Sequence, residues 1–148
     1  NDLVRHYGLE GFVRLEINVR FDRLLDLMCR SKVYVHPLPG EPFGISTVEA
    51  MSAGIIPVVP DIGGHTEFVP ARYQFHTYGE GVQAVAAALA APASERIKLS
   101  HSTQKYSVTN YIEKFQQILV KVMDISRKRL ESNPVISLSK RQPESLTT

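Results

Sequence analysis

Two glutamates, Glu41 and Glu49, lie on either side of a glycine in the segment GEPFGISTVE, residues 40–49. Carboxylates accept hydrogen bonds from neutral hydroxyl groups such as those of sugars. Gly44 has no Cβ, so a ligand can approach its backbone closely. A helix is predicted to begin here, and a helix N-terminus presents unpaired N–H groups and the positive end of a dipole to an anion. The segment therefore predicts a site for a ligand that contains both a phosphate and a polyol.

The surrounding residues define how this predicted site is built. Glu41 precedes Pro42, which favours an extended conformation at the mouth of the turn. Glu49 lies one helical turn beyond Ile45 and therefore on the same helix face. A second glycine-rich segment, DIGGHTE at residues 61–67, follows the next predicted strand. Because ligands of parallel α/β sheets bind beyond the carboxyl ends of the strands, we expect both loops to lie on one rim of the sheet.

The elements that position these loops follow from the hydrophobic pattern. Strands are predicted at about 13–19, 32–38, 55–60 and 73–77, and helices at about 1–7, 21–28, 43–53, 82–89, 94–106 and 110–125. Ser94 is expected to cap one helix, and Thr109 or Asn110 the last one. The alternation of strands and helices at short spacing predicts an α/β fold with a Rossmann-like parallel sheet and helices on both faces.

Length, charge and cysteine content narrow the class of protein. The 148 residues are enough for one domain with a sizeable core, and the net charge of +2 gives no reason to expect nucleic acid as a partner. One cysteine excludes an internal disulfide and fits a reducing compartment, and no apolar run reaches membrane-spanning length. These features favour a cytoplasmic protein. The scattered histidines have no ligand spacing, so no metal site is predicted.

The chain is expected to divide at residue 125 or 126. Residues 1–125 are predicted to form the domain, and residues 126–148, rich in Ser, Pro, Lys and Arg, a mobile or packing tail. The basic residues of this tail either are simply solvated or attract anionic lipid headgroups. The first residue is Asn1, in what reads as the middle of a domain, so we expect a fragment of a longer protein.

Residues EPFGISTVEAMSAG at 41–54 and IPVVPDIGGHTE at 56–67 resemble the C-terminal domain of retaining glycosyltransferases of family 4, which have the GT-B fold. An acidic pair with seven residues between its members is the signature of that family. The resemblance runs from about Val13 to Leu89. The variant HPLPGEPFG at 36–44 is most similar to archaeal and eukaryotic lipid-linked mannosyltransferases.

The resemblance implies a nucleotide-diphosphate sugar, UDP- or GDP-linked, bound between two Rossmann-like domains without a metal or other cofactor. Glu41 would be the catalytic residue, in contact with donor-sugar hydroxyls near the reacting carbon. The backbone of residues 43–45 would meet the diphosphate or sugar, and Glu49 would hold the ribose hydroxyls. The donor-binding residues that the resemblance implies are Glu41, Pro42, Phe43, Gly44, Ile45, Glu49, Gly63, Gly64 and Glu67, the last three shaping the neighbouring rim.

The implied reaction moves a hexose, with retention, from the donor to a sugar or lipid-linked acceptor. The family's basic pair for the diphosphate and its acceptor-binding N-terminal domain lie upstream of this sequence, so we expect the fragment alone to be inactive. A peripheral place on the cytoplasmic face of a membrane stays open. Two alternatives also stay open: a GT-B-fold epimerase or phosphorylase, and a non-catalytic nucleotide-binding module. His36 is either a partly buried histidine or a substrate contact, and the role of His65 is open.

Overall fold

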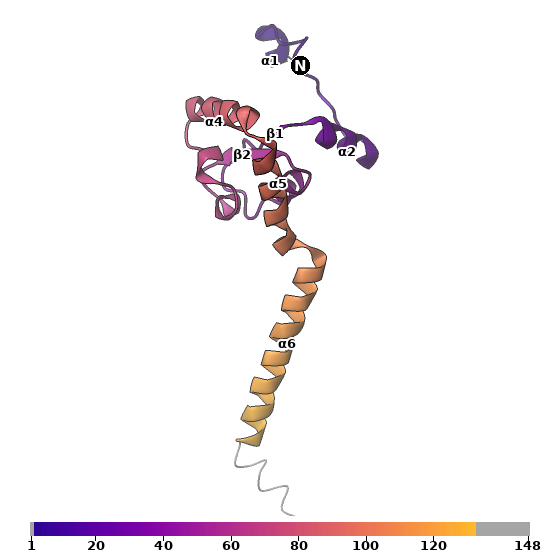
Figure 1. Ribbon diagram of the computed structural model, residues 1–148, viewed down its shortest axis with the longest axis vertical. Coiled ribbons are helices and arrows are strands. Elements are labelled where there is room, and N and C mark those ends of the chain that lie inside the picture. The colour runs from indigo at the N-terminus through magenta and orange to yellow at the C-terminus, as the bar shows by residue number, and fades with distance from the viewer. Residues whose placement is uncertain (1, 133–148) are drawn as a thin grey trace, which may run out of the picture. The chain divides into compact units, whose positions relative to one another are not determined.

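The computed structural model describes residues 2–132 of the chain (Figure 1). Three strands, β1 (Val33–Val35), β2 (Ile56–Pro60) and β3 (Gln74–Phe75), form one parallel sheet in the order β1-β2-β3. Helices connect the strands and pack against them. The predicted α/β class with a Rossmann-like parallel sheet is therefore confirmed.

The helices fall into two compact units, one ending at Ser102 and the other beginning at Thr103. The first unit contains, besides the sheet, α1 (Asp2–His6), α2 (Phe21–Arg30), α3 (Ile45–Ser52), α4 (Tyr78–Ala90), α5 (Ala93–Ser102) and the short 3-10 helices η1 (Gly64–Glu67) and η2 (Ala71–Tyr73). The second contains η3 (Thr103–Tyr106) and α6 (Val108–Glu131). The loops of interest all belong to the first unit.

The core of the first unit is built around β2. All five of its residues are buried, as the continuous apolar run predicts for a strand covered on both faces. Helix α4 contacts all three strands and α3 contacts β2. The buried apolar side chains of the core cluster are Met51, Ile56, Val58, Val59, Val69, Tyr73, Ala84, Ala88 and Leu99. This packing holds the carboxyl ends of β1 and β2 next to each other, where both loops begin.

Helix α4 begins with a capping box. The Thr77 hydroxyl accepts a hydrogen bond from the Glu80 N–H, and the Glu80 carboxylate accepts from the N–H groups of Thr77 and His76. Because it accepts from His76 and then from Thr77, the Glu80 carboxylate has a pKa below its ordinary value. The lowered pKa means that the ionised carboxylate helps to hold this helix end.

Acidification is expected to loosen the start of α4. A carboxyl group whose pKa is lower in the folded state stabilises the fold above its unfolded pKa of about 4.3, and this contribution is lost as the pH falls through the folded pKa. Hydrogen exchange of α4 amides, compared between wild type and Glu80→Gln at each pH, should show a difference at pH 6 that shrinks below about pH 4. A difference that stays constant over this range would contradict the assignment.

The strand predicted at 13–19 is wrong. Residues 13–20 form an irregular segment, and the side chains of Val13, Leu15 and Ile17 are exposed. Asn18 has a φ of 52°, in the left-handed region, which breaks an extended run. Alternation alone cannot supply the neighbouring strand that a β-strand requires, and none of the described residues pairs with this segment.

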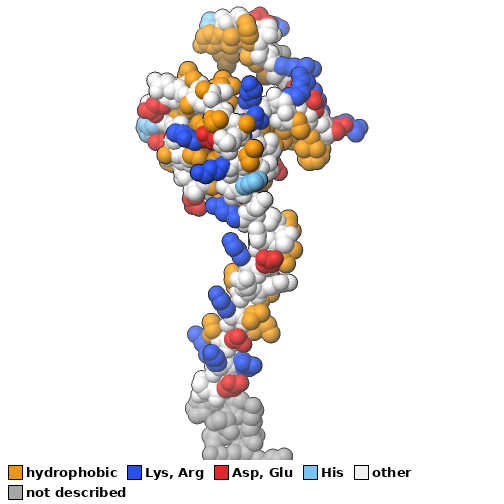
Figure 2. All heavy atoms as spheres, viewed as in Figure 1, with side chains coloured by type: hydrophobic (Ala, Val, Ile, Leu, Met, Phe, Trp, Pro, Cys, Tyr) orange, Lys and Arg blue, Asp and Glu red, His pale blue; other side chains and the backbone are white. Residues whose placement is uncertain are grey.

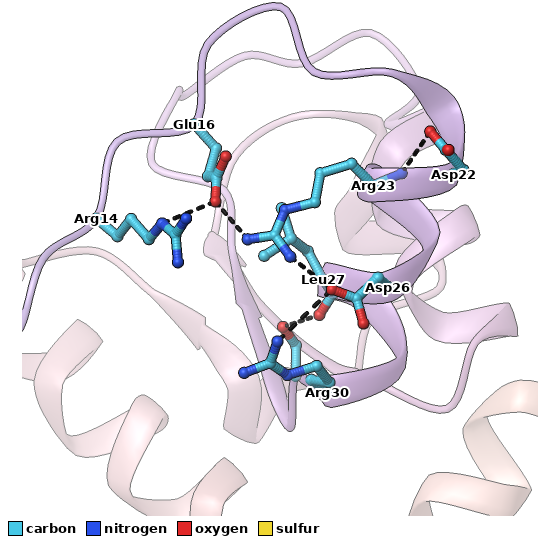
Figure 3. A network of polar contacts seen from close by, with 8 residues as sticks. Arg14, Glu16, Asp22, Arg23, Asp26, Leu27 and Arg30 are labelled. Carbon is cyan, nitrogen blue, oxygen red and sulfur yellow. Dashed lines mark hydrogen bonds and ion pairs between the residues drawn. The ribbon is translucent and has the colours of Figure 1, made fainter.

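Charged side chains tie this segment to α2 instead (Figure 3). Glu16 forms ion pairs with Arg14, at 2.9 Å, and with Arg23 of α2. Arg23 also pairs with Asp26 at 2.6 Å, and Arg30 lies 3.6 Å from the same carboxylate. The hydrogen bond from Arg23 holds the pKa of Glu16 below its ordinary value. Polar tethering thus replaces the predicted strand pairing.

Two predicted helix boundaries are also corrected. Helix α5 begins at Ala93, so Ser94 lies inside it. Ser107, not Thr109 or Asn110, caps α6, because its hydroxyl accepts from the N–H of Asn110. The predicted domain limit at 125/126 falls inside α6, which continues to Glu131. The rest of the predicted tail, from residue 133, lies outside the described residues.

Helix α6 carries both apolar and charged side chains on its surface (Figure 2). Its exposed apolar side chains include Phe115, Leu119 and Val122. Among residues 2–132, no helix is both long and apolar enough to span a bilayer.

Candidate functional site

The two predicted loops lie side by side at the carboxyl ends of β1 and β2. We call residues 36–44 the Glu41 loop and residues 61–64 the glycine loop. Glu41 and Gly63 form a parallel β-bridge, and the Gly64 N–H donates to the Glu41 carbonyl at 2.7 Å. The Gly40 N–H donates to the carbonyl of Ile62 at 3.1 Å. The predicted placement of both loops on one rim is therefore confirmed.

The two loops approach so closely because the second has no side chains at the contact. A Cβ on Gly64 would lie 2.1 Å from the Pro42 carbonyl oxygen, and a Cβ on Gly63 would lie 2.7 Å from the Glu41 carbonyl oxygen. Gly63 also has a φ of +119°, a conformation that other residues rarely adopt. The glycine loop thus acts as a backbone support for Glu41, a closer role than the rim-shaping that the sequence suggests.

Helix α3 begins at the end of the Glu41 loop. Gly44 is its N-cap, with a φ of 95°, and is buried. The Gly44 N–H donates to Oε1 of Glu41 at 3.2 Å. A Cβ on Gly44 would lie 3.2 Å from the Thr47 hydroxyl oxygen and 3.3 Å from Cβ of His65. The catalytic candidate therefore also binds the N–H of the N-cap residue, at a position where only glycine fits without displacement.

The remaining residues of this segment face outward. Pro42, Phe43 and Ile45 are exposed, and the Phe43 ring lies 5.6 Å from that of Phe68. The surface at this segment therefore consists of apolar side chains beside backbone groups. Glu67 is also exposed, at the end of η1.

Glu49 borders a different hollow from the Glu41 loop. A cavity of about 250 Å³ lies between α2, β1 and α3. Glu49, Ser46 and Tyr34 form part of its wall, and the rest is mainly apolar, from Leu24, Leu27, Met28, Val33, Ala50 and Ile55. Neither Glu41 nor the glycine loop lines this cavity. The two acids thus offer carboxylates to adjacent but separate regions.

A partly buried histidine, His36, lies in the Glu41 loop, and a fully buried one, His65, follows the glycine loop; the predicted site residues include neither. His65 is fully buried, and its Nε2 lies 2.8 Å from the Pro60 carbonyl, which must accept the bond. The ring of His36 lies 5.8 Å from that of His65, edge to face, and its Nε2 lies 3.6 Å from Oε2 of Glu41. In the sequence, the position of His36 at the end of a predicted strand is the feature that could have indicated a place near the site. Nothing in the pattern around His65 distinguishes it from a loop residue.

No cluster of three or more His, Cys, Asp or Glu side chains among residues 2–132 is arranged to hold a metal ion. Metal-independence stays a prediction. The polar groups that the site offers are carboxylates, histidine nitrogens and backbone amides.

The Glu41 loop and Glu49 both lie in a part of the chain that matches a known protein family. The model of the family "Glycosyl transferases group 1" matches residues 1–109, which is more than half of the sequence. The chain belongs to this family.

Several curated relatives are glycosyltransferases. Over 140 residues, 89% of this chain and 28% of the relative, the chain is 25% identical to "GDP-Man:Man(3)GlcNAc(2)-PP-Dol alpha-1,2-mannosyltransferase" of Dictyostelium discoideum. Over 66 residues it is 37% identical to the "Phosphatidylinositol N-acetylglucosaminyltransferase gpi3 subunit" of Schizosaccharomyces pombe, covering 45% of this chain and 14% of that protein. Over 55 residues it is 42% identical to "GDP-mannose:cellobiosyl-diphosphopolyprenol alpha-mannosyltransferase" of Xanthomonas oryzae, covering 37% and 14%. The chain thus spans less than a third of the length of these relatives.

Proposed function

We propose that this chain is the donor-binding part of a glycosyltransferase that moves mannose from GDP-mannose to a lipid-linked acceptor, with retention at the anomeric carbon. The observation that carries the proposal is the Glu41 loop, held by two glycines at the start of α3, within a family of glycosyltransferases. Two of the relatives described above name GDP-mannose and a lipid-diphosphate acceptor. The third transfers N-acetylglucosamine, so a UDP-linked donor is the competing choice.

Each proposed role follows from the chemistry of the group that performs it. Glu41 accepts hydrogen bonds from donor-sugar hydroxyls, and the start of α3 attracts the diphosphate. Glu49, at the wall of the neighbouring cavity, accepts bonds from the ribose hydroxyls. The exposed positions of Pro42, Phe43 and Ile45 suit contact with the donor along the same edge. Glu67 adds a carboxylate at the far side of the glycine loop.

The mechanism that we propose needs no metal. Stabilisation of the leaving diphosphate would come from helix N-terminal amides and from basic side chains outside this sequence. The acceptor would be held by a further domain, and the enzyme would work at the cytoplasmic face of a membrane. Activity in the presence of a chelator is a direct consequence of this mechanism.

The experiment is an assay of the complete natural polypeptide with labelled GDP-mannose, UDP-N-acetylglucosamine and a polyprenyl-diphosphate sugar acceptor. We expect label from GDP-mannose in the lipid fraction, an α-linkage by NMR, and full activity in EDTA. Label that returns as an altered sugar nucleotide would indicate an epimerase. Donor binding without any turnover would indicate a non-catalytic module.

A further inference from the structure

We infer that His36 is a positioning residue that orients the carboxylate of Glu41, and that Tyr34 and Ser46 fix the His36 ring. This inference rests on the proposed function for its kinetic consequences, but its structural content stands on the contacts alone.

A chain of polar contacts leads from α3 to Glu41. Ser46 Oγ lies 2.9 Å from the hydroxyl of Tyr34, and that hydroxyl lies 3.2 Å from Nδ1 of His36. The other ring nitrogen, Nε2, lies 3.6 Å from Oε2 of Glu41. Thus α3, β1 and the start of the Glu41 loop each supply one side chain of a path that ends at the catalytic candidate.

The contacts allow an arrangement in which the proton of His36 lies on Nε2, the nitrogen that faces the Glu41 carboxylate. A tyrosine hydroxyl both donates and accepts, so Ser46 can donate to Tyr34 while Tyr34 donates to Nδ1. A neutral imidazole that accepts at Nδ1 carries its proton on Nε2. The His36 ring then presents an N–H toward a carboxylate oxygen, and the charge on that oxygen strengthens the contact.

His36 is held in place from several sides. Its backbone N–H donates to the Val58 carbonyl at 3.0 Å, which ties it to the end of the sheet. The His65 ring packs against it edge to face, and its own side chain is 15% exposed. A ring fixed in this way can restrict the orientation of the Glu41 carboxylate.

The Nε2 atom of His36 is buried and has no hydrogen-bond partner within the described residues. A buried donor without a partner costs free energy, so a neighbouring acceptor is expected to serve it. The carboxylate of Glu41 is such an acceptor, at 3.6 Å, slightly beyond hydrogen-bond length. Contacts of catalytic groups are often long without substrate and shorten when it binds. Because Oε1 of Glu41 already accepts from Gly44, His36 would complete the grip on both oxygens.

Two variants separate the two nitrogens of the ring. His36→Gln keeps a donor near the position of Nε2, whereas His36→Asn keeps a polar group near Nδ1 and loses the one that faces Glu41. With the complete polypeptide and the identified donor, we expect His36→Asn to lower kcat about 10- to 100-fold with little change in KM. His36→Gln should restore most of kcat, and Tyr34→Phe should cause a smaller loss. His101→Asn, on α5, is the control for removal of a histidine elsewhere.

A double-mutant cycle tests whether His36 acts through Glu41. In a Glu41→Gln background, His36→Asn should change kcat by less than about twofold, because the carboxylate that it orients is no longer there. An undiminished additional loss would overturn the inference. Wild-type activity of Glu41→Gln and Glu41→Ala would overturn the proposed function instead.

A structural readout needs no activity. Crystal structures of the complete polypeptide without donor should show the Glu41 carboxylate in one place in the wild type and His36→Gln, and displaced in His36→Asn. A carboxylate that stays in place in His36→Asn would overturn the inference even if the protein proves to be a different kind of enzyme. Thermal unfolding of each variant excludes general loss of folding as the cause.

Discussion

Replacing Glu41 with alanine in the complete polypeptide should lower kcat about 30- to 1000-fold, which corresponds to about 2–4 kcal/mol of lost transition-state stabilisation. The reason is the position of the carboxylate at the start of α3, where the proposed donor sugar would carry the charge that develops during transfer. KM for the donor should change less than kcat, because the contact is expected to strengthen in the transition state. Initial rates at saturating acceptor measure both.

Glu41→Ala also removes the acceptor of the Gly44 N–H, which by itself costs about 0.5–1.5 kcal/mol of stability. Glu41→Gln keeps an oxygen for that N–H and loses the charge. A large loss of kcat in this variant would therefore come from the missing charge and not from a change in local folding. Glu113→Gln, an exposed acid of α6, serves as the matched control and should retain wild-type rates. Wild-type turnover by Glu41→Ala would contradict the proposed role of this residue.

Gly64→Ala should have an effect of similar size by a different route. Its new Cβ would lie 2.1 Å from the Pro42 carbonyl oxygen and 2.9 Å from Cα of Phe43, both of which are backbone atoms that cannot rotate away. The two loops must therefore separate, at a cost of about 1–3 kcal/mol of stability or more. A displacement of about 1 Å in the carboxylate is enough for a loss of about 100-fold in kcat/KM.

The matched control is Gly79→Ala. Gly79 lies in α4, and a Cβ there would meet only the Thr77 hydroxyl oxygen, at 4.0 Å. Alanine is the better helix former, by about 1 kcal/mol, so this variant should be as stable as the wild type or more so. Urea unfolding and initial rates of both variants make the comparison. Normal stability and rates in Gly64→Ala would show that the loops are not held as the backbone contacts indicate.

The sheet and the two loops could be predicted because their signals are local and redundant. The run from Ile55 to Pro60 is apolar at every position, and β2 is buried at every position. Glycine-containing segments follow each of the two neighbouring strands, and this order predicts that both loops lie at one edge of the sheet. The resemblance to a family agreed with this pattern, and the match over residues 1–109 confirms the family.

Other features depended on information that the sequence does not contain. Alternating residues at 13–19 look like a strand, but the structure gives them no partner strand and a left-handed Asn18. In α4 the small residues Ala84 and Ala88 are buried, whereas Val82 and Leu89 are exposed, so the larger side chains indicate the wrong stripe. The exact capping residue of a helix, Ser107 for α6, depends on the local backbone geometry, so a sequence pattern locates it only to within one or two residues.

The candidate site was predictable in its acids and glycines but not in its supporting contacts. Glu41 and Gly44 stand out by type and spacing. The supporting contacts form where Tyr34 on β1, His36 in the following loop and Ser46 on α3 come together. Such contacts follow from tertiary structure, because each residue taken alone is ordinary at its position.

The N–H of Gly44, the N-cap residue of α3, is already bound by the protein's own carboxylate. An anion that takes this N–H has to exchange with Glu41, so it gains less from this group than from an unoccupied one. A ligand that also offers hydroxyl groups to the displaced carboxylate offsets that loss. We therefore expect this site to bind a molecule that joins an anionic group to hydroxyl groups better than it binds either group alone.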